Sequence, residues 1–192
     1  MKKFKILVVG CGNMGASHAR AYHQMKDFEI VGLVSRKPES REKLSQELGG
    51  YPTFGDYETA LRETNPDAVS INTYPDTHYE YVKTALNNDA HVFIEKPLAL
   101  TVSDAQELVD LALHKNRKMM VGYILRVHPA WSKFVEVAHT LGKPLVMRMN
   151  LNQQSSGENW YTHKQLMNSM SPIVDCGVHY VDVMCLMTRS EP

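Results

Sequence analysis

The chain has 192 residues, of which 43% are hydrophobic and 22% are charged, and its 21 basic and 21 acidic side chains cancel to a formal charge of zero. The apolar content suffices for a folded core and excludes intrinsic disorder. The balanced charge excludes the overall basic field of a general nucleic-acid binder. The N-terminal apolar run is too short for a secretion signal, and no window approaches the ~18 apolar residues of a membrane span, so we expect neither.

The three cysteines, Cys11, Cys176 and Cys185, lack the CxxC spacing of a zinc ribbon and the close grouping of a disulfide framework. Thiols without such a pattern are typical of a reducing compartment. We therefore expect a cytoplasmic protein.

In the first two-thirds of the chain, short apolar runs typical of strands alternate with helical patterns. The expected strands cover residues 5–9, 29–34, 68–72, 91–94 and 119–122. The expected helices cover residues 13–25, 39–48, 56–63, 77–87 and 102–115. Pro38 suits the first turn of the second helix, and Thr101 can cap the fifth. Strands that are apolar on both faces and alternate with helices predict βαβ units, so the expected fold is α/β, a doubly wound parallel sheet of the Rossmann type.

The pattern changes after residue 122. The elements expected beyond it are a helix, a strand, a polar loop and a helix, over residues 129–141, 145–152, 153–159 and 174–187. A single strand has no sheet to join, so these elements cannot form a normal second domain. We therefore expect a Rossmann domain over 1–123 and the N-terminal part of a second α/β domain over 124–192, in a cleaved or truncated form of a longer chain.

Residues 10–15 read Gly-Cys-Gly-Asn-Met-Gly and lie between the first strand and the first helix. In this context GxGxxG indicates a dinucleotide-binding turn. Gly10 permits the tight turn, Gly12 lets a pyrophosphate approach the backbone, and Gly15 lets the helix pack closely on the strand. The free N–H groups of the helix N-terminus then face the phosphates. The alternative is a chance glycine-rich turn.

The end of the second strand faces the adenosine ribose in this fold, and an Asp or Glu there selects NAD. Here Ser35 stands 20 residues after Gly15 and is followed by Arg36 and Lys37, without an acid. A hydroxyl donor and a guanidinium suit a 2′-phosphate. The sequence therefore favours NADP over NAD, and a solvated basic loop is the alternative.

Two further strand ends carry polar residues. One reads Asn-Thr-Tyr-Pro-Asp-Thr-His over residues 72–78, where Pro75 holds the loop, and the other reads Glu95-Lys96-Pro97. Because ligands bind at the carboxyl ends of parallel strands, we expect Glu95 and Lys96 in the same cleft as the glycine loop. Lys96 could donate to a substrate hydroxyl or lower the pKa of a neighbouring acid. A solvated Glu-Lys pair in a loop is the alternative.

The last expected helix carries a third polar cluster. Asp175 and His179 are four residues apart and share one helical face, and Asp182 lies near it. An Asp one turn before a His can orient the imidazole, which could then take a proton from an alcohol as hydride leaves its carbon. The alternatives are a structural histidine and a metal site. We expect no metal, because the set has one imidazole and no second His four residues on.

Together these motifs resemble the Gfo/Idh/MocA oxidoreductases, named for glucose–fructose oxidoreductase and inositol dehydrogenase. The shared residues, in chain order, are the loop 10–15 with His18, Thr73 with Pro75 and His78, Glu95-Lys96-Pro97, Gly122-Tyr123 with Arg126, and Asp175-x-Gly-x-His179. The resemblance implies a Rossmann domain followed by an α/β domain with an open, mostly antiparallel sheet. It also implies an NAD(P)-dependent enzyme that acts on sugars, inositols, related polyols or dihydrodiols, and a dimer or tetramer.

By the same resemblance, Lys96, Asp175 and His179 meet over the nicotinamide, and His179 is the acid and base. The expected cofactor contacts are Gly10, Gly12, Asn13, Met14, Gly15, Ser35, Arg36, Thr73, Pro75, His78, Glu95 and Lys96. The expected substrate contacts are Lys96, Tyr123, Arg126, Trp160, Asp175 and His179, with Tyr161 and His163 as further pocket candidates.

Two features depart from the family pattern. Many members carry a glycine run before the Asp-x-Gly-x-His motif, where this chain reads Ser-Met-Ser-Pro-Ile-Val over residues 169–174. Members also usually continue well past this point. The main hypothesis is an NADP-dependent oxidoreductase of sugars, cyclitols or diols. The alternatives are a non-catalytic NADP-binding module or sensor, which would not need Lys96, Asp175 and His179, and a metal-dependent lyase or hydrolase.

Overall fold

A computed structural model describes residues 3–143, 145–150, 156–157, 160, 164, 167 and 170–190. The chain forms two compact units, Met1–Val121 and Gly122–Pro192. Among the residues described, no helix is long and apolar enough to cross a membrane.

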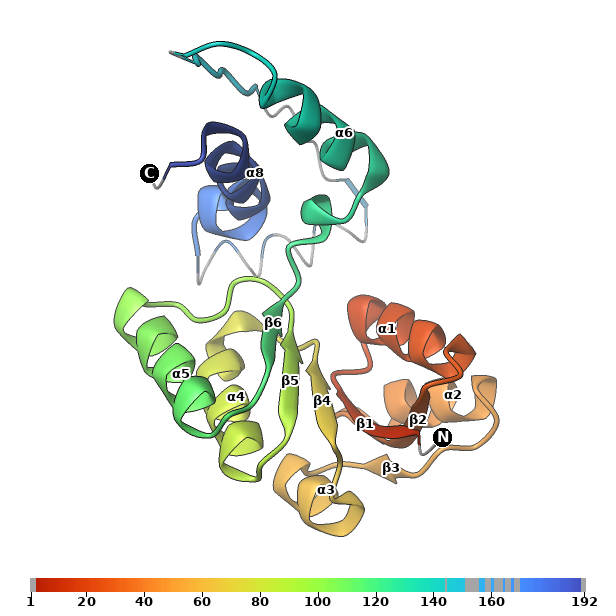
Figure 1. Cartoon of the computed structure of the whole chain (residues 1–192). Coiled ribbons are helices and arrows are strands. Elements are labelled where there is room, and N and C mark those ends of the chain that lie inside the picture. The colour runs from red at the N-terminus through yellow and green to blue at the C-terminus, as the bar shows by residue number, and fades with distance from the viewer. Residues whose placement is uncertain are drawn as a thin grey trace. The chain divides into compact units, whose positions relative to one another are not determined.

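The first unit is built on a six-stranded parallel sheet (Figure 1). Its strands are β1 Phe4–Val9, β2 Phe28–Val34, β3 Thr53–Phe54, β4 Ala68–Ile71, β5 His91–Ile94 and β6 Met119–Val121. They lie in the order β3-β2-β1-β4-β5-β6, and every neighbouring pair is parallel. This confirms the predicted Rossmann-type sheet. The strand β3 was not predicted, because two residues are too short to show a period.

Helices connect these strands and begin where the sequence predicts, to within one residue. They are α1 Asn13–Gln24, α2 Pro38–Glu47, α3 Tyr57–Thr64, α4 His78–Asn87 and α5 Val102–His114, and a 3₁₀ turn, Pro75–Thr77, precedes α4. Pro38 is the first residue of α2, where its missing N–H costs nothing. The Thr101 hydroxyl accepts a hydrogen bond from the backbone N–H of Asp104 at 3.1 Å and so caps α5, as predicted.

Apolar side chains cover both faces of the sheet, because alternate residues of each strand point to opposite sides. Ile6 and Val8 pack with residues of α1 and α2 in one core cluster. Leu7 and Val9 pack with residues of α3, α4 and α5 in the other. The first unit is therefore a helix–sheet–helix sandwich.

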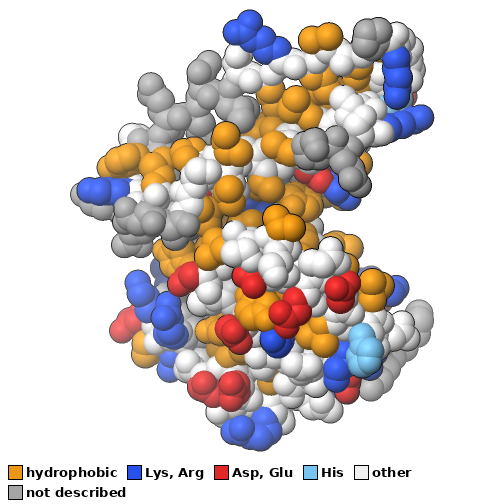
Figure 2. All heavy atoms as spheres, turned by 90° about the vertical axis from the view of Figure 1, so that its left-hand side faces the viewer, with side chains coloured by type: hydrophobic (Ala, Val, Ile, Leu, Met, Phe, Trp, Pro, Cys, Tyr) orange, Lys and Arg blue, Asp and Glu red, His pale blue; other side chains and the backbone are white. Residues whose placement is uncertain are grey.

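Exposed apolar side chains lie on α5 and on the edge strand β6. Val102 and Leu113 of α5 are 87% and 74% exposed, and Met120 of β6 is 64% exposed on the opposite face of the sheet, because its neighbours Met119 and Val121 pack in the cluster that contains α5. Figure 2 shows hydrophobic side chains interspersed with acidic ones on the face of the first unit that includes α5. An apolar surface next to an edge strand is a common place for a protein contact.

The strand order places a switch point between β1 and β4. From β1 the chain proceeds to β2 and β3 on one side, and it then returns to β4 on the other side. In open parallel sheets, ligands bind outside the carboxyl ends of the strands at such a point. The glycine loop follows β1 at this edge.

The second unit contains the 3₁₀ turn Ile124–Arg126, the helix α6 Pro129–Ala138, a π-helical turn Ile173–Gly177 and the helix α8 Val178–Thr188. Ala138 of α6 packs against Val183 and Met187 of α8 in a small core. The predicted helix over 129–141 is therefore confirmed, but it ends three residues early.

The predicted strand over 145–152 is wrong for residues 145–150, which form no strand. The alternation of side chains can describe an extended segment, but a strand also needs a neighbour to pair with. The described residues of the second unit contain no other strand. Leu151, Asn152 and most of the predicted loop 153–159 lie outside the residues that the structure describes.

Candidate functional site

The glycine loop has the geometry that its sequence predicts. Gly10 has φ +91°, which L-residues rarely adopt, and a Cβ atom there would lie 2.4 Å from the backbone oxygen of Asn72. A Cβ on Gly15 would lie 1.7 Å from the backbone oxygen of Gly10. These distances confirm that Gly10 forms the tight turn and that Gly15 permits close packing of α1 on the turn.

The position of Gly12 fits the approach of a phosphate group. A Cβ atom on Gly12 would meet nothing within 4 Å, so the backbone is open on this side. Gly12 is also the N-cap of α1, and the first turn of this helix, which contains Asn13 and Met14, carries no acidic side chain. An open glycine at an uncapped helix N-terminus provides free N–H groups for an anion, so the residues present fit a dinucleotide pyrophosphate.

Cys11 lies inside this loop but points into the protein. Its thiol donates to the backbone oxygen of Val34 at 3.5 Å, and the residue is 7% exposed. Burial raises the pKa of Cys11 to about 11, although the charge of Arg41 opposes this shift. Cys11 is therefore a structural residue of the loop.

The loop after β2 begins with Ser35 and the basic residues Arg36 and Lys37. The backbone N–H of Ser35 donates to Phe54 of β3 at 3.1 Å, and its hydroxyl accepts from the N–H of Lys37 at 3.3 Å. Arg36 is exposed. Sequence reasoning missed Arg41, whose Nη1 donates to the backbone oxygen of Ser35 at 2.8 Å. The sequence signal that could have identified Arg41 is its place in the first turn of α2, from which a long side chain can reach the preceding loop.

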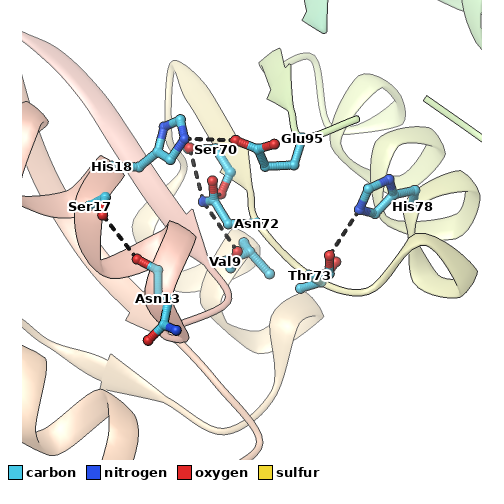
Figure 3. Close-up of polar contacts among 9 residues, drawn as sticks. All are labelled: Val9, Asn13, Ser17, His18, Ser70, Asn72, Thr73, His78 and Glu95. Carbon is cyan, nitrogen blue, oxygen red and sulfur yellow. Dashed lines mark hydrogen bonds and ion pairs between the residues drawn. The ribbon is translucent and has the colours of Figure 1, made fainter. Parts of the chain in front are cut away.

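His18 and Glu95 join the glycine helix to the end of β5 (Figure 3). Nε2 of His18 lies 3.0 Å from Oε1 of Glu95, and the ring centroid of His18 lies 4.9 Å from that of Phe93 in β5. Glu95 is 8% exposed. Burial raises the pKa of the Glu95 carboxyl, but the hydrogen bond from His18 and the charges of His18 and Lys96 outweigh it and hold this pKa below its ordinary value. A buried anion therefore adjoins Lys96.

Asn72 and Thr73 begin the loop after β4. The amide nitrogen of Asn72 donates to the backbone oxygen of Ser70 at 3.0 Å and approaches that of Val9 at 3.5 Å (Figure 3). The hydroxyls of Thr73 and Thr77 lie 2.7 Å apart. These bonds fix the loop beside the glycine turn. Sequence reasoning did not assign this part to Asn72, because one of its partners, Val9, lies on the neighbouring strand β1.

His78 follows the loop after β4 and is buried. Its ring is fully buried, with Nδ1 2.6 Å from the backbone oxygen of Pro97 and Nε2 3.1 Å from that of Thr73. Burial lowers the pKa of His78, although both carbonyls and the carboxylates of Glu95 and Asp76 oppose this shift. A ring without exposed surface argues against the predicted direct contact of His78 with the cofactor.

In the second unit, three of the predicted substrate contacts lie in one cluster. Arg126 makes a two-pronged ion pair with Asp182, in which Nε lies 2.8 Å from Oδ2. The Arg126 guanidinium lies 5.5 Å from the Tyr123 ring centroid, and the rings of Tyr123 and His179 meet edge to face at 6.3 Å. Burial and the Asp182 carboxylate raise the pKa of Tyr123.

Asp175 lies in the π-helical turn and not in the α-helix predicted over 174–187. Such turns are frequent at functional sites. Asp182 is already paired with the Arg126 guanidinium, whose positive charge would repel a metal ion at this carboxylate. No group of metal-binding side chains is found among the residues described.

Of the other predicted substrate contacts, Trp160 is 42% exposed. Tyr161 and His163 lie outside the described residues. The predicted meeting of Lys96 in the first unit with Asp175 and His179 in the second stays a prediction.

Comparisons with known proteins agree with this architecture. Residues 4–123 match the family model GFO_IDH_MocA, an oxidoreductase family with an NAD-binding Rossmann fold. UDP-N-acetylglucosamine 3-dehydrogenase of Acidithiobacillus ferrooxidans is 28% identical over 185 residues, which cover 96% of this chain and 54% of the relative. Inositol 2-dehydrogenase of Klebsiella pneumoniae is 26% identical, with coverages of 94% and 53%.

A solved structure shares the fold. Scyllo-inositol dehydrogenase of Lactobacillus casei, with bound NAD(H) and scyllo-inositol, has a TM-score of 0.80 at 21% identity and covers 98% of this chain and 57% of its own. The chain spans about half the length of the curated relatives it matches. On the match over 4–123, the chain belongs to the Gfo/Idh/MocA family of oxidoreductases.

Proposed function

We propose that the chain carries the cofactor-binding part and the acid–base residues of an NAD(P)-dependent oxidoreductase that acts on a CH–OH carbon of a sugar, cyclitol or diol. The observation that carries this proposal is the glycine turn, which is closed to side chains at Gly10 and Gly15 and open at Gly12. The sugar and cyclitol dehydrogenases among the relatives support the substrate class. The bound nicotinamide supplies the hydride chemistry.

The residues around the switch point would hold the dinucleotide. The turn at Gly10, Gly12 and Gly15, with Asn13 and Met14 of α1, takes the pyrophosphate. Thr73 and Pro75 after β4, and Glu95 with Lys96 after β5, form the wall toward the nicotinamide. The support for this arrangement is that all three loops follow carboxyl strand ends at one edge of the sheet.

The proposed cofactor is NADP in preference to NAD. Ser35 stands where an NAD-selective acid would stand, Arg36 is exposed beside it, and the Arg41 guanidinium holds the Ser35 backbone at 2.8 Å. Cationic groups and a hydroxyl donor favour a 2′-phosphate, whereas an acid would repel it.

The proposed acid and base is His179, which takes the hydroxyl proton during oxidation and returns it during reduction. Lys96 binds and polarises the same oxygen, and Asp175 orients His179 or binds a second hydroxyl. Tyr123, Arg126 and Trp160 are the proposed substrate contacts. The ring contact between Tyr123 and His179, and the ion pair that fixes Arg126, support placing the first two near the acid and base.

Calorimetric titration of the chain with NADPH and with NADH tests the cofactor assignment. We expect NADPH to bind at least about tenfold more tightly, which corresponds to about 1.4 kcal/mol. Arg36→Met should remove this preference and leave NADH affinity unchanged, whereas Arg62→Met, a matched change at an exposed arginine of α3, should alter neither. Tighter NADH binding would refute the NADP preference alone, and binding of neither would refute the cofactor site.

The alternative of a binding module or sensor is separated by hydride exchange. An oxidoreductase should exchange hydride between NADPH and a carbonyl compound from a sugar and cyclitol panel, and His179→Asn should depress turnover while cofactor affinity stays nearly unchanged. Binding without exchange on any panel member would favour the module.

A homo-oligomer in the cytoplasm completes the proposal. The apolar side chains exposed on α5 and β6 support a contact with a second copy. The cysteine spacing supports a reducing compartment. Light scattering after size-exclusion chromatography measures the oligomer directly.

A further inference from the structure

Two histidines, one buried and one half-buried, contact the residues on either side of Lys96. His18 of α1 lies on the Glu95 side, with Nε2 3.0 Å from the carboxylate oxygen Oε1. His78, the first residue of α4, lies on the Pro97 side, with Nδ1 2.6 Å from the backbone oxygen. The two rings come from helices on opposite faces of the sheet. The segment 95–97 is therefore held from both sides.

Each contact needs only one proton on the ring. A carboxylate and a carbonyl only accept, so His18 donates from Nε2 and His78 donates from Nδ1, and a neutral imidazole can supply either bond. The His78 side chain is fully buried and that of His18 is 18% exposed. Hydrogen bonds made away from water are costly to leave unmade, so both rings restrain the backbone that they contact.

His78 also contacts the neighbouring loop. Its Nε2 lies 3.1 Å from the backbone oxygen of Thr73 (Figure 3). Thr73 follows Asn72, whose backbone oxygen would lie 2.4 Å from a Cβ on Gly10. Both carbonyls only accept, so a neutral ring donates to the Pro97 oxygen and packs against the Thr73 oxygen without a second hydrogen bond. The ring still lies between the Lys96 segment and the loop that packs against the glycine turn.

We propose that His18 and His78 are a pair of positioning residues that fix the backbone of Lys96 relative to the glycine turn. This inference rests on the proposed function, in which Lys96 contacts substrate and cofactor. Neither ring acts on the substrate itself. Their effect is to reduce the number of conformations of the segment 95–97, so that less free energy is lost in ordering Lys96 when the dinucleotide binds.

The test compares variants that remove the bonds with variants that keep a donor. His18→Phe and His78→Phe remove both ring nitrogens and keep a planar ring, whereas His18→Gln and His78→Gln keep one N–H donor. His23→Phe is the control for α1, because His23 bonds only to the Tyr51 hydroxyl among the contacts described, at 2.8 Å. Tyr57→Phe is the control for a buried bond, because its hydroxyl donates to the backbone oxygen of Tyr81 in α4 at 3.0 Å.

Two measurements are made on each folded protein. Hydrogen exchange at the amides of Lys96 and Leu98 reports the restraint without any ligand, and titration with NADPH reports its effect on binding. We expect each Phe variant to accelerate this exchange and to weaken NADPH binding by about tenfold, the factor that one buried hydrogen bond carries. The Gln variants should recover most of the slow exchange and most of the NADPH affinity. The two controls should match the unaltered chain in both measurements.

The outcomes separate this inference from the proposed function. Unchanged exchange in both Phe variants, or a loss of NADPH affinity in the controls as large as in the Phe variants, would overturn the positioning role. If the unaltered chain binds no nicotinamide dinucleotide, the proposed function fails, and accelerated exchange in the Phe variants alone would still support the restraint of Lys96.

Discussion

The loop after β1 and the loop after β5 reach the same edge of the sheet, and they are shaped by opposite means. The glycine loop depends on the absence of side chains, because a Cβ at Gly10 or Gly15 would overlap backbone atoms. The segment 95–97 depends on the presence of side chains, because His18 and His78 bond to it from both sides. The first loop should therefore be sensitive to any added atom, and the second to any lost donor or charge.

The largest effect is expected from an added methyl group in the glycine loop. Gly15→Ala would place a Cβ 1.7 Å from the backbone oxygen of Gly10, and backbone atoms cannot move aside without shifting α1 or β1. We expect the free energy of unfolding to fall by about 3 kcal/mol or more. Urea unfolding followed by circular dichroism measures the change.

Gly12→Ala is the matched control for this steric argument. Its Cβ would meet nothing within 4 Å, and the residue has an ordinary φ of −78°. The free energy of unfolding should change by less than about 0.5 kcal/mol, while dinucleotide binding weakens because the methyl occupies the open side. Equal destabilisation by both changes would contradict the different parts assigned to Gly12 and Gly15.

A smaller effect is expected from removal of the buried charge. Glu95→Gln replaces an 8% exposed carboxylate that bonds to His18, and we expect a loss of about 2 kcal/mol at pH 7, the size of a hydrogen bond to a charged group. Because the pKa of Glu95 is lowered in the folded chain, this stabilisation is fully present above the ordinary glutamic acid pKa. It is lost as the pH falls through the lower, folded value.

Urea unfolding of both proteins at several pH values checks this dependence. The difference in the free energy of unfolding should be constant near neutral pH and shrink in acid. A difference that stays constant into acid would mean that the Glu95 charge does not stabilise the loop.

The smallest loss of stability is expected when ion pairs of the second unit are broken. Arg126→Met breaks the two-pronged pair with Asp182, whose side chain is 10% exposed, and should cost about 1 kcal/mol. Lys133→Met breaks a pair with Glu136 in which both side chains are 66% exposed, and should cost less than about 0.5 kcal/mol. Both tryptophans, Trp131 and Trp160, lie in the second unit, so their fluorescence during urea unfolding reports on it. Equal losses of unfolding free energy in the two variants would show that burial of Asp182 does not strengthen its ion pair.

The parts of the site that sequence predicted well are local. The Pro38 start of α2 and the Thr101 cap of α5 each depend on residues within one turn of the chain, so a short pattern determines them. The spacing of the glycines is also a short pattern, although the backbone that crowds Gly10 comes from Asn72. The parallel sheet followed from apolar runs at regular spacing. The strand expected over 145–152 failed because pairing depends on a neighbour that the pattern does not contain.

The parts that sequence could not predict are the long-range bonds. His18 and Glu95 are 77 positions apart, and no spacing rule connects them. His78 lies in a recognisable motif, yet its burial between two carbonyls depends on where the Pro97 loop returns. A motif can therefore identify a residue near a site without deciding whether it touches the ligand or supports the residues that do.

The buried thiol in the glycine loop has a practical consequence for labelling. Burial raises the pKa of the Cys11 thiol to about 11, so at pH 7 it is protonated and unreactive. Cys176 and Cys185 in the second unit are half-buried. A maleimide dye should therefore attach to the second unit first and leave the phosphate turn unmodified. The chain can then carry a fluorescent reporter for dinucleotide titrations without replacement of any cysteine.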